Sequence, residues 1–247
     1  MPDMKLYRGT NKVIKCPKIN PKSRFLNFGA GCYYVFNKKI AERDAQEMTH
    51  RMQCGSPVVN VYEIDKEALK GLKVLKIAKP DMDWLTHILA CRKGVYNGEE
   101  YDVILAPLPC RNLNDRICSC EMHTKRKPCL FSYKKTDFFN AAVFKTEAAL
   151  SLIKFSGTSE IEFKPYIRRN FSSSLSLFNL ISPIIKYVSM RTGMSKLRSL
   201  EKFYFSDIYE KINDLSLKLG YFSGRAIGEI LVEELETGKL SYPDEDL

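Results

Sequence analysis

The sequence predicts an α+β domain followed by a small all-α domain. Three observations favour this fold class. Short strand patterns alternate with helix patterns as far as residue 157. A stretch rich in serine then follows, as is typical of a linker, and beyond it the apolar residues recur at helical spacing. We therefore expect a first domain over residues 1–157, a linker over 158–175 and a helical domain over 176–247.

The elements of the first domain follow from the spacing of apolar residues. Runs rich in β-branched and aromatic residues predict strands, and apolar residues on one face predict helices. Pro17 and Pro21 mark the segment after the first strand as a loop. We expect strands at 4–10, 31–36, 57–64 and 101–108, helices at 37–52 and 82–94, and a strand running into a short helix at 141–155.

Residues beyond the linker form only helical patterns. The last of them is the best marked, because Ser223 is a candidate N-cap and Gly238 lies just past its end. Proline removes a helical hydrogen bond, so we expect Pro183 to interrupt the first of these helices. The expected helices span residues 177–190, 196–205, 207–217 and 224–236.

Composition and charge narrow the class of protein. Hydrophobic residues make up 45% of the 247 residues and charged residues 28%, which is ordinary for a globular protein. The net charge is +10, yet residues 175–247 carry a net charge of −2, so the first domain and linker carry +12. Such a basic surface attracts phosphates of a dinucleotide, a nucleic acid or a membrane surface. Since the N-terminus lacks a secretory signal pattern and no long apolar run occurs, we expect a cytoplasmic protein without membrane spans.

Two short segments could bind a flat heteroaromatic ligand. In LYRGT, residues 6–10, the backbone of Gly9 could offer a donor and an acceptor to a carboxamide, because glycine allows close approach. Arg8 would add a planar cation for ribose or phosphate oxygens. In NFGAGCYYV, residues 27–35, Gly29 and Gly31 precede Tyr33, whose ring could support a nicotinamide by stacking. The alternative is a tight turn with no ligand.

The order of these segments resembles the ADP-ribosyltransferase fold, specifically its diphtheria-toxin and poly(ADP-ribose)-polymerase branch. LYRGT, FGAGCYYV and an amphipathic helix are followed by VVNVYEID, LACRKG, YDVILAP and AVFKTEAAL, which also resemble a bacterial family of unknown function. The resemblance implies a split mixed β-sheet core with flanking helices and NAD as substrate. It implies that Gly9 holds the nicotinamide carboxamide, Thr10 lies near the ribose and Tyr33 stacks on the ring.

Three positions depart from that family. Arg8 replaces a histidine of the first strand, although arginine occupies this place in the other branch of the fold. Asp44 falls where the second stacking aromatic is expected. Ala141 falls where a glutamate or glutamine is expected beside the nicotinamide ribose, so transfer is expected to be altered or lost. Other polar residues could take this role in a different register, and we weigh three of them: Asp137, Asn140 and Glu147.

A cysteine-rich segment could bind a metal. The cysteine thiolates of this segment are soft ligands, and together with the imidazole their number suits a tetrahedral zinc ion. Their spacing, however, lacks a paired Cys-x-x-Cys. The alternative is a loop of reduced thiols without metal. If metal binds, it would order the basic segment HTKRKP, which could contact nucleic acid. Our expectation is no metal at this group of residues: Cys110, Cys118, Cys120, His123 and Cys129.

The sequence thus leads to two hypotheses of different classes. In the first, the protein binds NAD and has weak, altered or absent ADP-ribosyl transfer to an unknown protein or nucleic-acid acceptor. In the second, it is a non-enzymatic interaction protein that uses the same fold as a scaffold and binds nucleic acid or protein through its basic face. Calorimetry with NAD distinguishes the two.

Overall fold

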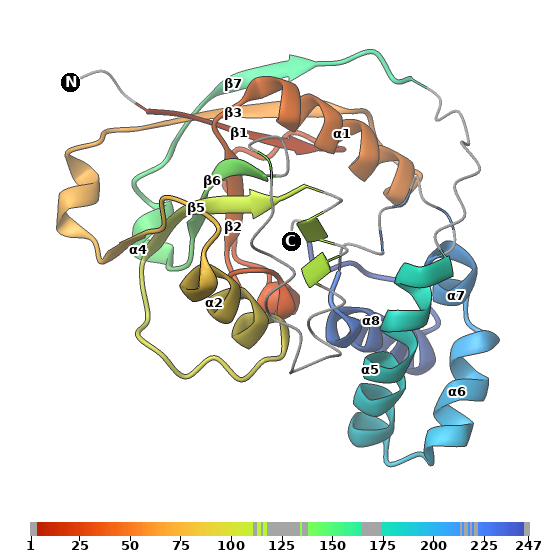
Figure 1. Ribbon diagram of the computed structural model, residues 1–247. Coiled ribbons are helices and arrows are strands. Elements are labelled where there is room, and N and C mark those ends of the chain that lie inside the picture. Colours follow the sequence, from red (N-terminus) through yellow and green to blue (C-terminus); the bar gives the residue numbers. More distant parts are fainter. Residues whose placement is uncertain are drawn as a thin grey trace.

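A seven-stranded mixed β-sheet forms the centre of the protein (Figure 1). The strands follow one another in the order β4-β5-β6-β2-β1-β3-β7, and helices flank the sheet. The α+β class predicted from the sequence is confirmed. This computed structural model describes residues 4–110, 113–114, 116–117, 134, 138–164, 174–212, 214, 217, 219 and 222–244.

The strands pair antiparallel except at one edge of the sheet. β4 and β5 are parallel, with Val74 paired to Val103, and every other neighbouring pair runs antiparallel. The junction between β1 and β2 is the weakest, since its register comprises one pair, Tyr7 and Val35. The strand bounds are β1 Met4–Thr10, β2 Cys32–Val35, β3 Val58–Ile64, β4 Val74–Lys76, β5 Val103–Pro109, β6 Phe138–Phe144 and β7 Lys154–Glu160.

The helices begin where the sequence supplies caps. Asn37 and Asp81 accept hydrogen bonds from backbone N–H groups in the first turns of α1 and α2, and Ser223 does the same for α8. Gly238 ends α8 in the left-handed conformation. The bounds are α1 Lys38–Met52, α2 Met82–Arg92, α4 Glu147–Leu150, α5 Ser174–Thr192, α6 Lys196–Tyr204, α7 Asp207–Ile212 and α8 Gly224–Thr237, with 3-10 helices η1 Pro21–Phe25 and η2 Ala68–Gly71.

The two faces of the sheet have different cores. Because side chains alternate along a strand, Tyr33 and Val35 point to one face, and Ala141 and Val143, their partners on β6, share it. We call this the α1 face, since α1 packs on it at Gly9. Trp84 and Ile88 of α2 also belong to a core on this side. The opposite face buries a second core built on Leu6, Tyr34, Tyr62 and Phe144.

Several elements differ from those expected. α7 ends at Ile212 and not at residue 217, and β6 begins at Phe138 and not at residue 141. β4 was not predicted, because three residues are too short to show a pattern. β7 includes residues 158–160, which we had placed in the linker; an edge strand exposed at every second residue has the polar composition of a loop. The interruption expected at Pro183 is wrong, since α5 continues through it. Pro183 packs on Gly224, where a side chain would lie 2.6 Å from the ring.

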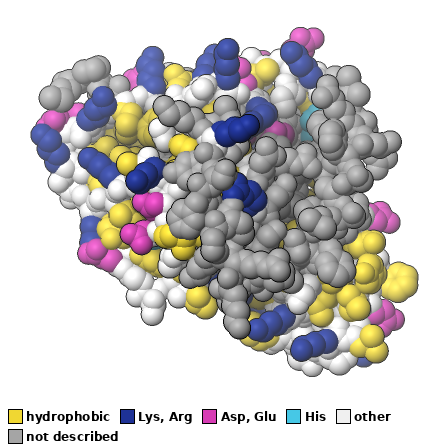
Figure 2. Space-filling view, in the orientation of Figure 1, with side chains coloured by type: hydrophobic (Ala, Val, Ile, Leu, Met, Phe, Trp, Pro, Cys, Tyr) yellow, Lys and Arg dark blue, Asp and Glu magenta, His cyan; other side chains and the backbone are white. Residues whose placement is uncertain are grey.

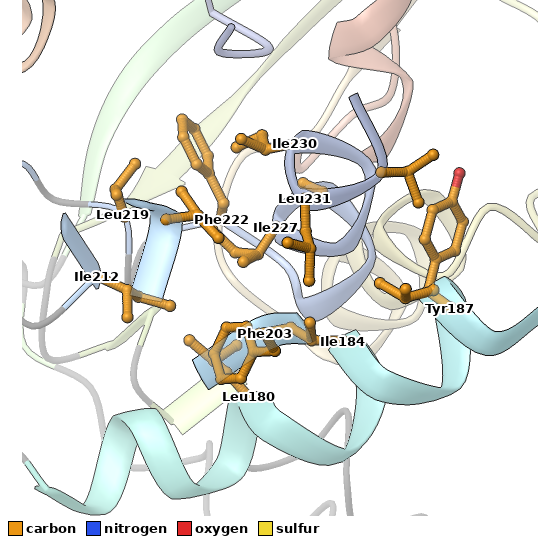
Figure 3. Packing of buried hydrophobic residues seen from close by; sticks show 14 of the residues in the cluster. Leu180, Ile184, Tyr187, Phe203, Ile212, Leu219, Phe222, Ile227, Ile230 and Leu231 are labelled. Carbon is orange, nitrogen blue, oxygen red and sulfur yellow. The ribbon is translucent and has the colours of Figure 1, made fainter. Parts of the chain in front are cut away.

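The C-terminal helices share a core with the N-terminal part of the chain. Phe25 of η1 belongs to the same buried cluster as residues of α5 and α8, and Leu26 and Met52 pack against that cluster. Ion pairs link Arg24 with Glu229 and Lys22 with Glu233. Figure 3 shows the centre of this cluster, where α5 and α8 face each other through Leu180, Ile184, Tyr187, Ile227 and Leu231.

Basic side chains are distributed unevenly. In Figure 2, Lys and Arg outnumber Asp and Glu over the upper part of the view, where the sheet and α1 lie. Within the described part of the chain, no helix is both long and apolar enough to cross a membrane.

Candidate functional site

Gly9 and Tyr33 lie on the same face of neighbouring strands. The one register pair of β1 and β2 joins Tyr7 to Val35. Gly9 is two residues after Tyr7, and Tyr33 is two residues before Val35. Because the strands are antiparallel and side chains alternate, Gly9 therefore lies opposite Tyr33 on the α1 face. These two residues are not themselves paired. The end of β1 and the start of β2 therefore bring two of the predicted site residues, Gly9 and Tyr33, to one face of the sheet, and we take this region as the candidate site.

The α1-facing side of Gly9 is occupied by the helix. A Cβ atom on Gly9 would lie 1.9 Å from the carbonyl oxygen of Ala41 and 2.5 Å from the backbone nitrogen of Ala45. Both alanines are completely buried. Close packing of α1 on β1 is thus a sufficient structural reason for glycine at this position, whether or not its backbone also contacts a ligand.

Tyr33 closes the loop that precedes it. Its hydroxyl donates a hydrogen bond to the carbonyl oxygen of Gly29 (2.8 Å) and accepts one from the backbone N–H of Phe28 (3.0 Å). Burial raises the pKa of the phenol well above its usual range, so the hydroxyl is protonated near neutral pH. The ring is partly buried and packs against the core beneath α2. The hydroxyl is therefore committed to the loop, and the ring is the part that could meet a ligand.

Three further side chains hold this loop, residues 27–31. Lys145 donates to the carbonyl oxygen of Phe28, Ser23 accepts from the backbone N–H of Gly31 (3.2 Å), and Arg92 donates to the side-chain oxygen of Asn27 (3.0 Å). Sequence reasoning missed all three. Of the three, only Lys145 could have been identified from the sequence, because it directly follows the last residue of β6.

Gly29 and Gly31 are required by the loop for different reasons. Gly29 has a φ of 75°, a left-handed conformation that favours glycine. Gly31 lies against β6, where a Cβ atom would be 2.9 Å from the carbonyl oxygen of Phe144 and 2.8 Å from a methyl group of Val143. Both glycines shape the loop that leads into Tyr33, and their spacing alone does not indicate a phosphate site.

The polar groups behind the loop are partly or fully buried: Lys145 and His87 are partly buried and Cys91 is buried. Burial lowers the pKa values of Lys145 and His87 and raises the pKa of the Cys91 thiol to about 11. A Cβ atom on Gly29 would lie 3.2 Å from Nζ of Lys145 and 3.9 Å from Sγ of Cys91. The thiol is therefore protonated near neutral pH and is a poor nucleophile.

Arg8 and Thr10 lie on the opposite face of β1. The guanidinium carbon of Arg8 is 5.9 Å from the ring centroid of Tyr34. Thr10 is buried; its hydroxyl donates to the carbonyl oxygen of Lys12 (2.6 Å) and accepts from the carboxamide of Asn60 (2.8 Å). The structure therefore does not bring these two predicted site residues together with Tyr33.

Ala141 lies on the α1 face, next to the candidate site. It pairs with Val35 and is 1% exposed within the core beneath α2. Asn140 is exposed and points to the opposite face, and Glu147 is an exposed residue in the first turn of α4. Asp137 lies outside the described residues. Along described β6, the α1 face thus offers hydrocarbon to the ring of Tyr33.

Asp44 is on α1, next to Ala45 and hence close to Gly9. Its carboxylate is 3.8 Å from the guanidinium of Arg43, and its side chain is 38% exposed. A carboxylate cannot replace the second stacking ring that the resemblance led us to seek at this position.

The cysteine-rich segment is largely outside the described residues. Cys110, directly after β5, is partly exposed. The basic segment HTKRKP and four of the five candidate ligands belong to the undescribed part: Cys118, Cys120, His123 and Cys129.

Comparison with known proteins places most of the sheet-forming part of the chain in one family. The family model described as "Protein of unknown function (DUF3990)" matches residues 4–155. No curated protein and no solved structure matches the chain significantly.

Proposed function

This chain belongs to the DUF3990 family of proteins of unknown function, and we propose that it binds NAD as an ADP-ribosyltransferase-like protein with weak or lost transfer activity. One observation carries the proposal. Gly9 and Tyr33 fall opposite each other on one face, at the point where the pairing of β1 and β2 comprises one residue pair. The end of β1 pairs with β3 at Val58 and Val59, but its edge toward β2 is not paired there, and an unpaired edge leaves backbone donors and acceptors for a ligand.

Each residue has a defined role in this proposal. The backbone of Gly9 binds the carboxamide of nicotinamide, and the ring of Tyr33 stacks on the heterocycle. Gly29 and Gly31 shape the loop that positions this ring. Arg8 and Thr10 contribute to the opposite face of the sheet and take no direct part, in contrast to our expectation from the sequence.

Ala141 explains why transfer is weak in this proposal. When the bond between nicotinamide and ribose breaks, positive charge develops at the ribose carbon, and an oriented oxygen acceptor stabilises it. The methyl group of Ala141 offers no such acceptor. The loss of one preorganised polar group typically lowers a rate about 100- to 1,000-fold.

Calorimetry on the full chain tests NAD binding. We expect saturable heat with NAD for the wild type and for Tyr33→Phe, which retains the ring, and no binding for Tyr33→Leu, which removes it. Circular dichroism establishes that both variants fold. Absence of heat at millimolar NAD in folded wild-type protein would refute the proposal, as would equal affinity in Tyr33→Leu. Incubation with labelled NAD and potential acceptors measures transfer separately.

A second function is favoured by a different set of observations. The hydroxyl groups of Thr10 and Tyr33 are engaged within the protein, α1 fills one side of Gly9, and Ala141 is buried. All four observations are consistent with a protein that retains the fold as a scaffold and binds a macromolecule through its basic face. Failure to bind NAD together with salt-dependent binding of a polyanion would support this second function.

A further inference from the structure

An open groove lies at the opposite end of β2 from Tyr33. It forms where β2 ends, β6 begins and α1 starts, and its volume is about 480 Å³. This volume is within the range of sites that hold a small ligand or one of its rings. The groove is lined chiefly by Phe36, Asn37, Ile40, Phe138, Phe139 and Asn140.

The lining combines aromatic rings with carboxamides. Phe36, Phe138 and Phe139 are partly exposed, and Asn37 and Asn140 are exposed. Phenylalanine rings bind nucleobases by stacking, since every base presents a π face. A carboxamide offers both a donor and an acceptor to the edge of a base. The six residues that define the groove carry no formal charge, so its floor suits an uncharged ring.

Lysines adjoin the lining residues of the groove in sequence. Lys38 and Lys39 directly follow Asn37, and Lys76 and Lys79 flank Ala78, which also lines the groove. All four lysines are exposed.

Two carboxylates lie close in sequence to these lysines. The ammonium group of Lys38 is 3.9 Å from Glu42 and donates to the hydroxyl of Ser159 on β7 (3.1 Å), so Lys38 is directed away from the groove. Asp81 caps α2 by accepting from the backbone N–H of Trp84. Within the described part of the chain, Lys39, Lys76 and Lys79 form no ion pair. The local balance is thus positive, and it suits phosphates that enter from either side of the groove.

We propose that this groove binds single-stranded nucleic acid, with bases stacked on the phenylalanine rings and phosphates next to the lysines. A duplex would hide the base faces that the rings need. An acidic peptide would satisfy the lysines and leave the aromatic floor unused. Phe36 is three residues beyond Tyr33, which is about 10 Å along an extended strand. The site thus neighbours the proposed NAD site and does not depend on it.

Fluorescence anisotropy of the full chain with short labelled RNA and DNA single strands of one sequence tests the proposal. We expect saturable binding that weakens from about 50 mM to about 200 mM salt. Phe138→Leu should lower affinity about 5- to 150-fold if one base stacks on this ring. Lys39→Gln and Lys79→Gln should each weaken binding and lower the salt slope by about 0.7.

Matched controls come from the helical part of the chain. Phe205 is 86% exposed and Lys202 is exposed on α6, so Phe205→Leu and Lys202→Gln make the same chemical changes away from the groove. Both should bind like the wild type. If Phe138→Leu does not fold, Asn140→Ala tests the groove in its place, because Asn140 is exposed.

Four results would overturn the proposal. The first is no saturable binding at low salt, and the second is equal affinity in groove and control variants. The third is a duplex or an acidic peptide that binds as tightly as the single strands. The fourth is displacement of the labelled oligonucleotide by AMP or NAD at the same concentration as the oligonucleotide. That result would mean that the groove binds a mononucleotide. A loss of NAD heat in Tyr33→Leu with unchanged oligonucleotide binding would separate the two sites.

Discussion

Gly9 lies against the backbone of Ala41, so closely that a Cβ atom would be 1.9 Å from its carbonyl oxygen. The contact joins the end of β1 to the first turn of α1. Backbone atoms on both sides form it, so no side-chain rotation can relieve a clash. The position of α1 relative to the candidate site therefore depends on the absence of one methyl group.

Gly9→Ala should destabilise the fold, because α1 must move away from β1. We expect a loss of about 1–3 kcal/mol or more in the free energy of unfolding, measured by urea denaturation. Gly71→Ala is the control, since nothing lies within 4 Å of the added atom. It should leave stability nearly unchanged. An equally stable Gly9→Ala protein would mean that α1 packs farther from β1.

Ala141→Gln should lower stability without restoring transfer. Ala141 is 1% exposed in a filled core, and a larger polar side chain there is expected to cost about 1–3 kcal/mol. Thermal unfolding and transfer of label from NAD measure the two effects. If the variant were as stable as the wild type and gained transfer, the glutamine would have reached a bound ribose, and our account of the packing at β6 would be wrong.

Stability should fall as the pH drops through the titration of His87. Burial lowers the pKa of His87 in the folded state, and the charge of Lys145 lowers it further. The pKa of histidine in the unfolded chain is about 6.5. As the pH falls below this value, the imidazole of His87 therefore binds a proton more readily in the unfolded chain than in the folded protein. The free energy of unfolding decreases from there down to the folded pKa and then levels off.

His87→Gln provides the comparison for this pH dependence. Urea denaturation between about pH 5 and pH 7.5 should show a shallower decline in the variant than in the wild type. Parallel curves for the two proteins would exclude His87 as the titrating group. The ring of His87 contacts those of Phe28 and Tyr96, so the two proteins are compared by slope and not by absolute stability.

Arg51→Ala should loosen the end of the chain. Arg51 is buried at the C-terminal end of α1, where it pairs with Asp244 and lies over the rings of Phe222 and Tyr242. Removing a charge-assisted hydrogen bond typically costs about 1.5–3 kcal/mol. Limited proteolysis should cut the variant faster near its C-terminus. Arg43→Ala, at a half-exposed position, should change the rate little.

Much of the fold could be predicted because the relevant signals are local. The strand at β3 and the helix at α1 follow from the spacing of apolar residues. The caps Asn37 and Ser223 follow from the hydrogen-bonding chemistry of their side chains. β4 and β7 were missed because a three-residue strand and a polar edge strand resemble loops in sequence.

The candidate site was harder to predict because it depends on which face each residue occupies. Alternation along β1 already separates Arg8 and Thr10 from Gly9, so this part was readable from the sequence and we grouped the three wrongly. The contact of Gly9 with Ala41 and the bond from Lys145 to the loop join distant segments. Neither has a signature in the spacing of residues.

Phe25 lies in the N-terminal part of the chain and is buried among residues of the C-terminal helices. This contact limits where the chain can be cut into fragments. The matched family region ends at residue 155, yet a chain cut there would present Phe25, Leu26 and Met52 to water without their partners. Such a fragment should be prone to aggregate. Experiments on isolated pieces would therefore report on a damaged surface, and recombination between related genes would have to carry both pieces together.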